Sequence, residues 1–305
     1  GGLTGDALTE GTRNVAVGNS ALSTDTLGSN SVAIGPNALF AQNFTTATNS
    51  YNVAVGANAG IAVTDGVKNT FIGGLAGDAN TGASENTAMG HAALGANVAG
   101  AENVAIGERA LEVGNGGSFN TAVGRTALRS ASGNNNTAVG IKAGFAVTTG
   151  AQNTLIGGLA GDSITEGANN VAVGFNSLIA DTLGTGSTAV GKQTLSQQDF
   201  TTATQTHNTA IGFGAGNTMT TGVRNTLIGS QAGDANTDAD ENVAVGADAL
   251  GVNQLGSRST AIGDATLNTQ NPATAVDMYN VAVGHSAGGA ISVGVENTLI
   301  GGRSG

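Results

Sequence analysis

A five-residue motif recurs seventeen times along the chain and ends each time in glycine. Its first four positions hold Asn or Ser, then Val or Thr, then Ala, Leu or Phe, then Val, Ile or Met. Most successive motifs are 17 residues apart, one pair is 16 apart and three pairs are 21 apart. Such a register indicates one small structural unit stacked many times, because a single unit is too small to bury a core. The anchor glycines that close the motifs are Gly18, Gly35, Gly56, Gly73, Gly90, Gly107, Gly124, Gly140, Gly157, Gly174, Gly191, Gly212, Gly229, Gly246, Gly263, Gly284 and Gly301.

Each repeat is interpreted as one coil of a parallel β-solenoid. A second glycine usually follows the anchor glycine by ten residues, as at Gly66 and Gly222. Two glycines predict two corners, because glycine adopts positive φ and lets backbones approach closely. Short extended stretches such as residues 103–106 lie between them. We therefore predict an all-β fold, with about seventeen coils in one continuous domain over residues 1–305, as a segment of a longer fibre.

The extended stretch before each anchor glycine is apolar on both faces. Its second and fourth residues, such as Val104 and Ile106, point to one face, and its third residue points to the other. This pattern predicts a strand buried on both sides, with the coil interior on one side and copies of the same chain on the other. The sequence leaves open which face meets the copies. The third residue is usually Ala, and the larger residues there are expected in a trimer interface or in the coil core: Phe71, Leu155, Leu227 and Leu299.

Two further patterns accompany the repeat. The residue four places after each anchor glycine is Gly or Leu, in an order that indicates tandem blocks of four coils, 72 residues long between Gly140 and Gly212. The Asn that opens most motifs is expected to form a ladder, each side-chain amide bonding to neighbouring coils.

The composition argues against several classes of protein. Glycine makes up 51 of 305 residues, but it does not recur at every third position and there are only two prolines, so the chain is not collagen. The formal net charge is −11 and the ten Lys and Arg residues are dispersed, which argues against a nucleic-acid partner. No apolar run approaches the ~20 residues of a membrane span, so no membrane insertion is expected in this segment.

Catalytic and cofactor motifs are weak. His91, His207 and His285 lie on separate coils without a partner nucleophile, and no phosphate-binding glycine loop occurs. We therefore expect a non-enzymatic chain without a cofactor. A threonine column eight residues after many anchor glycines, as at Thr26 and Thr64, raises ice binding as a weaker alternative.

One acidic turn resembles a calcium loop. Oxygen-bearing side chains alternate at Asp234, Asn236, Asp238 and Asp240, as calcium ligands do. However, Ala239 occupies the place where such loops need glycine. A solvated acidic turn is therefore favoured, with calcium as the weaker interpretation.

The three 21-residue repeats carry insertions that begin at Phe44, Phe200 and Pro272. Loops held out from a rigid scaffold often bind partners. Thr45 and Thr201, together with the three residues that begin the insertions, are therefore candidate contact residues, although the apolar Phe side chains equally suggest packing.

The motif Ser31-Val32-Ala33-Ile34-Gly35 resembles the repeat in the head domains of trimeric autotransporter (YadA-like) adhesins. Residues 136–140, Asn-Thr-Ala-Val-Gly, are similar to the Asn-Thr-Ala-Ile-Gly repeats of phage tail-fibre-type proteins. The resemblance covers nearly the whole chain and implies a homotrimer of left-handed parallel β-rolls. It implies an extracellular location, on a cell surface or virion, and a cell-surface glycan or protein receptor. The 17-residue repeat is longer than that of the adhesin heads, which predicts larger outer turns. A monomeric solenoid that binds ice, calcium or glycan is the competing hypothesis.

Overall fold

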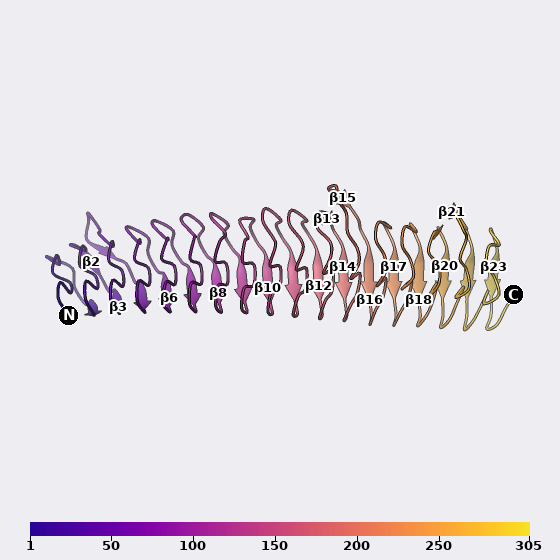
Figure 1. Cartoon of the computed structure of the whole chain (residues 1–305), viewed down its shortest axis with the longest axis horizontal. Helices are drawn as coiled ribbons and strands as arrows, with labels where there is room; N and C mark the ends of the chain where they lie inside the picture. The colour runs from indigo at the N-terminus through magenta and orange to yellow at the C-terminus, as the bar shows by residue number, and fades with distance from the viewer. The chain divides into compact units, whose positions relative to one another are not determined.

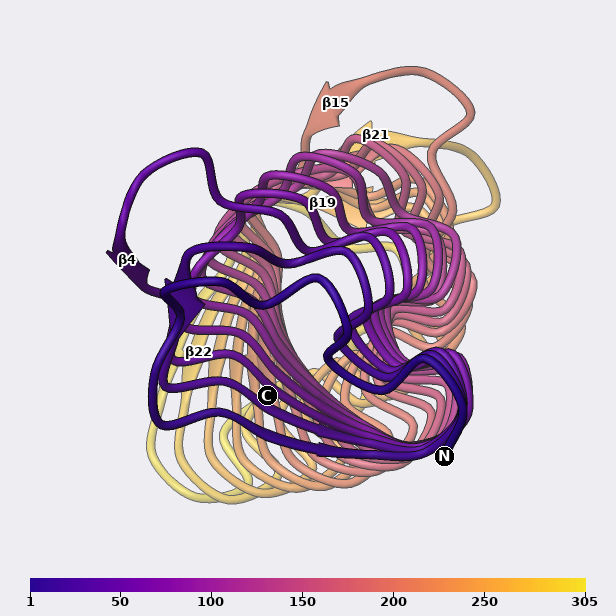
Figure 2. The same ribbon diagram turned by 90° about the vertical axis from the view of Figure 1, so that its left-hand side faces the viewer.

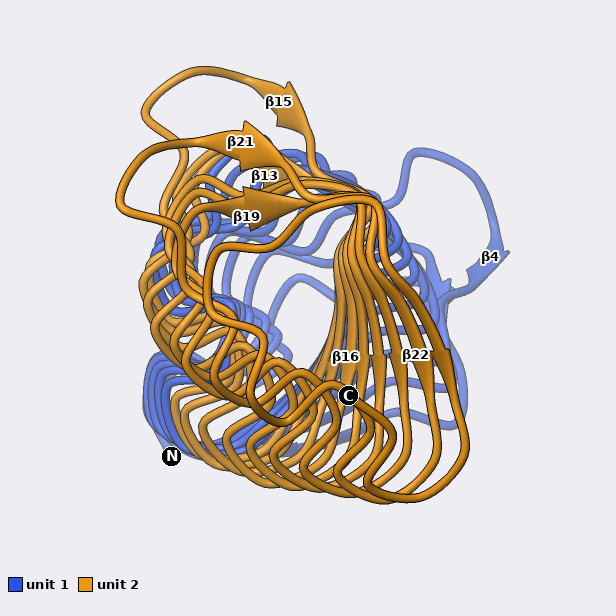
Figure 3. Cartoon of the chain, turned by 90° about the vertical axis from the view of Figure 1, so that its right-hand side faces the viewer, with its two compact units in different colours: residues 1–152 blue, residues 153–305 orange.

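The computed structural model describes residues 1–305 as short strands and turns without a helix (Figure 1). The predicted all-β parallel solenoid is confirmed, with about 17 turns. The chain divides into two compact units, residues 1–152 and 153–305 (Figure 3).

In both units one three-residue strand, the anchor strand, precedes each anchor glycine. Neighbouring anchor strands pair in parallel and in register, so that Val15, Ala16 and Val17 face Val32, Ala33 and Ile34. The anchor strands of unit 1 are β1 (Val15–Val17), β3 (Val32–Ile34), β5 (Val53–Val55), β6 (Thr70–Ile72), β7 (Thr87–Met89), β8 (Val104–Ile106), β9 (Thr121–Val123) and β10 (Thr137–Val139). Those of unit 2 are β11 (Thr154–Ile156), β12 (Val171–Val173), β14 (Thr188–Val190), β16 (Thr209–Ile211), β17 (Thr226–Ile228), β18 (Val243–Val245), β20 (Thr260–Ile262), β22 (Val281–Val283) and β23 (Thr298–Ile300).

The anchor glycines are required by the backbone. Gly73 has φ of 132°, and a Cβ atom there would lie 2.6 Å from the carbonyl oxygen of Gly90 in the next coil. The second glycine of the repeat is required for a different reason. At Gly66 φ is not positive, but a Cβ atom would collide with the carbonyl oxygen of Ala83. The expectation that positive φ makes both corners is therefore correct only for the anchor glycine.

Residues other than glycine hold most of the remaining left-handed positions. In a typical coil the second and fourth residues after the anchor glycine have positive φ, as at Asn37 (57°) and Leu39 (49°). The residue before the motif has it too, as at Asn30 (61°). Hydrogen bonds between coils hold these turns, including 3.1 Å from Leu39 N–H to the Ala59 carbonyl. The sequence did not reveal them, because most left-handed residues here are not glycine.

The third residue of the anchor strand points into its own coil. Ala33, Phe71, Leu155 and Leu227 are fully buried, and Leu299 in the last coil is half-buried. The structure therefore places the four larger residues in the coil core. It corrects the alternative in which this column would lie at an axis between chains.

The asparagine ladder is confirmed. Asn69 Oδ1 accepts a hydrogen bond of 3.0 Å from the backbone N–H of Asn86, and Asn69 Nδ2 donates to the Ala83 carbonyl at 2.9 Å. Equivalent bonds join Asn103 to Asn120 and to Gly117. Buried backbone groups at the corner are thus paired by side-chain amides at successive coils.

Candidate functional site

The three 21-residue coils, called here the long coils, span residues 36–56, 192–212 and 264–284. In each, the added residues leave the stack as a loop and return as a two-residue strand (Figures 2 and 3). That strand pairs in parallel with the preceding coil. The pairs are β2 (Gly28–Ser29) with β4 (Thr48–Asn49), β13 (Gly184–Thr185) with β15 (Thr204–Gln205), and β19 (Gly256–Ser257) with β21 (Val276–Asp277).

A buried polar cluster lies under the first loop. Gln42 Nε2 donates to Asp25 Oδ2 at 2.7 Å and to Ser31 Oγ at 2.9 Å, while Gln42 Oε1 accepts from Asn52 Nδ2 at 2.9 Å. Ser31 stands where most motifs have Asn, so Gln42 takes over part of the asparagine ladder. The Asp25 carboxylate also accepts the backbone N–H of Phe44, the first residue of the loop, at 3.3 Å. The cluster therefore fixes the point where the loop leaves the coil.

The second long coil repeats this cluster. Gln198 Nε2 donates to Asp181 Oδ2 at 2.7 Å, and Asp181 Oδ1 accepts from the backbone N–H groups of Gly184 and Phe200. Burial raises the pKa of the Asp181 carboxyl, and these hydrogen bonds act in the opposite direction.

The third long coil replaces the carboxylate by an amide. Asn253 Oδ1 accepts from Gly256 N–H at 3.1 Å, and its Nδ2 donates to the Gly256 carbonyl at 2.7 Å. Either an Asp or an Asn side chain can thus accept the backbone N–H group at this corner. The residues of this arrangement were missed from sequence, although Gln and Ser recur at fixed offsets before all three insertions and Asp before the first two.

The candidate contact residues of the loops divide into two groups. Phe44 and Phe200 are only 5% and 6% exposed, and Pro272 is buried, so these three pack against the coils. Thr45 and Thr201 are exposed. The loops are therefore anchored by an apolar side chain and display hydroxyl groups.

A ring follows each loop. Tyr51, His207 and Tyr279 are exposed and lie directly before the motif that closes each long coil. Sequence reasoning noted His207 only as a histidine without a catalytic partner and did not single out the two tyrosines. The signal that would have found them is their identical position in the repeat.

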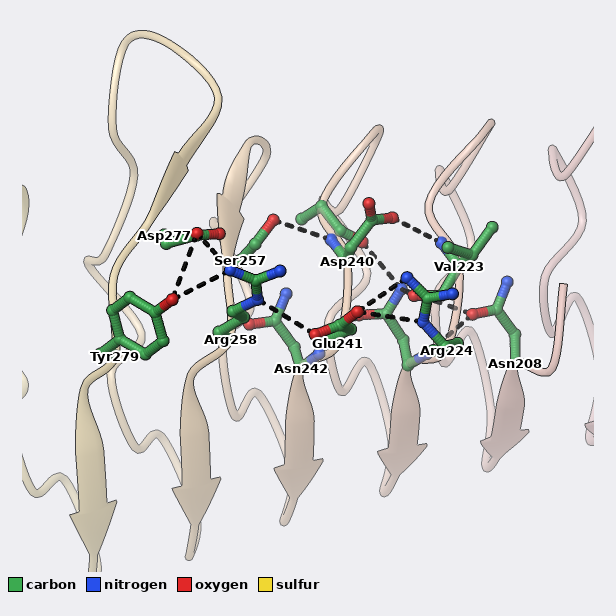
Figure 4. A network of polar contacts seen from close by, with 12 residues as sticks. Asn208, Val223, Arg224, Asp240, Glu241, Asn242, Ser257, Arg258, Asp277 and Tyr279 are labelled. Carbon is green, nitrogen blue, oxygen red and sulfur yellow. Dashed lines mark hydrogen bonds and ion pairs between the residues drawn. The ribbon is translucent and has the colours of Figure 1, made fainter.

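A ladder of charged and aromatic side chains crosses four coils of unit 2 (Figure 4). Glu241 bonds to Arg224 at 2.7 Å and to Arg258 at 3.0 Å, while Arg258 also bonds to Asp277 and donates to Tyr279 Oη at 2.9 Å. Hydrogen bonds from the two arginines lower the pKa of Glu241, and the partners of Arg258 raise its pKa. The ladder connects the third loop to the regular coils.

The four residues of the calcium candidate do not converge. Asn236 is buried inside the coil, whereas Asp238 accepts from Thr221 Oγ1 at 2.6 Å and Asp240 from the backbone N–H of Val223 at 2.8 Å. No group of three or more His, Cys, Asp or Glu side chains is placed to hold a metal.

Asp234, the fourth member, lines a cleft of about 310 Å³ with Asp248, Gly251, Val252 and Asn268. Burial raises the pKa of Asp234, and the neighbouring Asp248 carboxylate adds to this shift.

The outer face of each unit consists of the second and fourth residues of its anchor strands. Fourth-position residues are apolar in every strand and partly open to solvent, for example Ile34 (38%), Met89 (44%) and Ile262 (40%). Second-position residues are all Val or Thr, and neither position carries a charge in any of the seventeen motifs. Each single chain therefore presents a regular, uncharged, largely apolar sheet surface.

These features define a parallel β-solenoid repeat protein with three displayed loops and an uncovered sheet face. No protein-family model matches the chain, and no curated protein is significantly similar to it. None of its secondary structure is a helix of the length and apolar character needed to cross a bilayer.

Proposed function

We propose that the chain is a non-catalytic, structural and adhesive segment of a trimeric fibre, displayed outside the cell on a cell surface or a virion. The observation that carries this proposal is the outer face, an apolar surface repeated with the coils. A single soluble chain rarely leaves a long contiguous apolar surface exposed, since burying it is worth ~25 cal/mol per Å².

The spacing of the strands along this surface limits what kind of partner can cover it. Stacked strands lie ~4.8 Å apart, so a cover must present matching side chains at the same spacing over many coils. Another copy of this chain has that spacing because its strands are stacked in the same way. Absence of charge at the second and fourth positions lets such faces meet without burying an unpaired charge. The sequence resemblance to trimeric fibre repeats favours three copies.

The first test is the molar mass in solution at low concentration, by sedimentation equilibrium. The expected mass is three times the chain mass of 29.4 kDa. A stable monomer with intact β-structure in circular dichroism would remove this proposal.

Variants of the outer face make the test specific. Ile211→Lys combined with Ile228→Lys places charges on neighbouring rungs and should yield a folded monomer. The control pair Thr149→Lys and Thr221→Lys adds the same charge at exposed corners and should remain trimeric. A trimer that persists in the isoleucine variant would show that another surface holds the chains together.

A monomeric ligand-binding solenoid is the second candidate. Thr occupies the outward second position in most anchor strands of unit 2, beside Ile or Val. Regular columns of hydroxyl and methyl groups on a β-sheet are suited to ordering water as ice. Thermal hysteresis by a monomeric chain would favour this function over the fibre.

A further inference from the structure

A planar side chain occupies the same position in all three long coils. Tyr51, His207 and Tyr279 each precede the Asn of the closing motif, with φ of 50°, 50° and 49°. In the other coils this position holds a ring only at Phe119. Tyr51 and Tyr279 are also the only tyrosines among the 305 residues. The rings therefore accompany the loops and do not follow from the coil repeat.

The preceding coil supports two of these rings. His207 lies over Gly186, where a Cβ atom would be 3.0 Å from the imidazole Cδ2. The guanidinium of Arg258 lies 5.8 Å from the centre of the Tyr279 ring (Figure 4). Tyr51 and Tyr279 nevertheless remain 54% and 48% exposed. His207 and Tyr279 are thus supported from the preceding coil, and the two tyrosine rings still offer surface to a ligand.

The first loop carries no charged side chain, whereas Tyr279 lies against the ion pair of Arg258 and Asp277. The first loop displays Thr45 and Thr46, and Asn30 Nδ2 donates to Asn49 Oδ1 at 2.7 Å beside β4. No charged residue occurs from Asn43 to Asn52. In the third loop the one carboxylate, Asp277, is paired with Arg258. Hydroxyls and amides around an exposed ring match a sugar, whose C–H face packs on the ring while its hydroxyls form hydrogen bonds.

We propose that the bases of the three long coils are equivalent subsites for a neutral glycan, each centred on Tyr51, His207 or Tyr279. This inference rests on the adhesive role proposed above and names the ligand class of the loops. The buried clusters and the two-residue strand pairs hold each ring and loop in place before binding, which reduces the entropy lost on binding. Three subsites on one chain, multiplied by assembly, favour multivalent binding to a repetitive polysaccharide.

The test is electrophoresis of the full chain through native gels that contain dextran, mannan or galactan, with alginate as an acidic comparison. At least one neutral polysaccharide should retard the chain. The variant with Tyr51→Ala, His207→Ala and Tyr279→Ala should lose most retardation, because each ring is expected to contribute about 2- to 10-fold in affinity. Phe119→Ala is the matched control and should migrate as the unchanged chain. Tyr51→Phe should keep the retardation, since the ring remains.

Tyrosine fluorescence provides a second readout. The chain has no Trp, so its tyrosine emission comes from Tyr51 and Tyr279 alone and should change when the retarding polysaccharide is added. Retardation by alginate only, by none of the polysaccharides, or equally in the triple variant overturns the glycan inference. The molar mass separates the two proposals. A trimer without retardation removes only the glycan subsites, and a monomer that binds through its rings removes only the fibre.

Discussion

The ring of Phe71 fills the space that a side chain at Gly60 would need. A Cβ atom on Gly60 would lie 2.8 Å from Cδ2 of Phe71, and Gly77 on the other side is closer still. In unit 2, Leu227 lies in the same way between Gly216 and Gly233. The third residue of the anchor strand is large only where the residue four places after the anchor glycine is Gly in both of the coils that flank it. It is Ala wherever one of these two residues is Leu. The alternation of Gly and Leu in the sequence therefore compensates for the size of the third strand residue, because the two positions share one volume in the core.

This compensation predicts a reciprocal rescue. Phe71→Ala alone should lower the free energy of unfolding by about 3–5 kcal/mol through a cavity. Gly77→Leu alone should also destabilise, because the new side chain collides with Phe71. The double variant should recover much of the loss, since Leu94 occupies the same position of the repeat with the same left-handed backbone and its flanking anchor strands carry Ala. Urea denaturation of all four chains gives the coupling energy. Additive losses would refute the compensation.

The anchor glycines predict a sharp difference between neighbouring residues. Gly73→Ala should cost at least about 3 kcal/mol, because φ is 132° and the Cβ atom would strike the Gly90 carbonyl. Gly74→Ala is the control, where the nearest atom to a Cβ is 3.7 Å away and a change within about 0.5 kcal/mol is expected. Equal melting temperatures for the two variants would contradict this prediction.

The asparagine ladder predicts a large effect from one buried amide. Asn103→Ala would leave the backbone N–H of Asn120 and the Gly117 carbonyl without partners, at a cost of about 2–5 kcal/mol. Asn134 also accepts a backbone N–H, from Ser118, but at an exposed position. Asn134→Ala should therefore cost less than about 1 kcal/mol, since water replaces the lost bond. The unfolding midpoints in urea compare the two.

The buried carboxylate of Asp181 predicts a pH dependence. Its pKa is raised in the folded chain, so the folded state binds the proton more strongly than the unfolded state does. Its contribution to stability is therefore greatest below the unfolded pKa, about 3.9, and is lost as the pH rises through the folded pKa. Asp181→Asn, which copies Asn253, should be more stable than the unchanged chain at pH 7 and show a flatter pH profile. Asp65→Asn, at an exposed carboxylate in unit 1, is the control, and equal profiles for Asp181→Asn and the unchanged chain would oppose the assignment.

Calcium should leave the thermal stability unchanged. Asn236 is buried in the coil, Asp238 and Asp240 bond to different partners and Asp234 lines a separate cleft, so we expect no common set of calcium ligands. Differential scanning calorimetry with millimolar calcium and with chelator should therefore give the same melting temperature. Tight binding at 100 times its Kd would add about 2.7 kcal/mol, and such a rise would revive the calcium site.

Much of the fold was predictable because the repeat makes each contact many times. The spacing of the anchor glycines determined the coil length and the parallel register, and the Asn before each strand determined the ladder. The alternation of Gly and Leu four residues after the anchor glycine was visible too, but its relation to the size of the third strand residue was not. Phe71 and Gly60 are 11 residues apart, and only the stacked coils show that they share one volume.

The sequence by itself determined a β-solenoid with one coil per repeat and three displayed insertions, since periodic glycines and alternating apolar residues permit few other folds. Only the tertiary structure decided which strand face is inside, because Ala33 and Ile34 are both apolar and alternation alone cannot say which side a coil closes on. It also decided the left-handed turns at residues such as Leu39, which hydrogen bonds between coils impose on side chains that disfavour them. The same holds for the loop bases. Asp25, Gln42 and Asn52 are distant along the chain, and their grouping at one corner results from the stacking of successive coils.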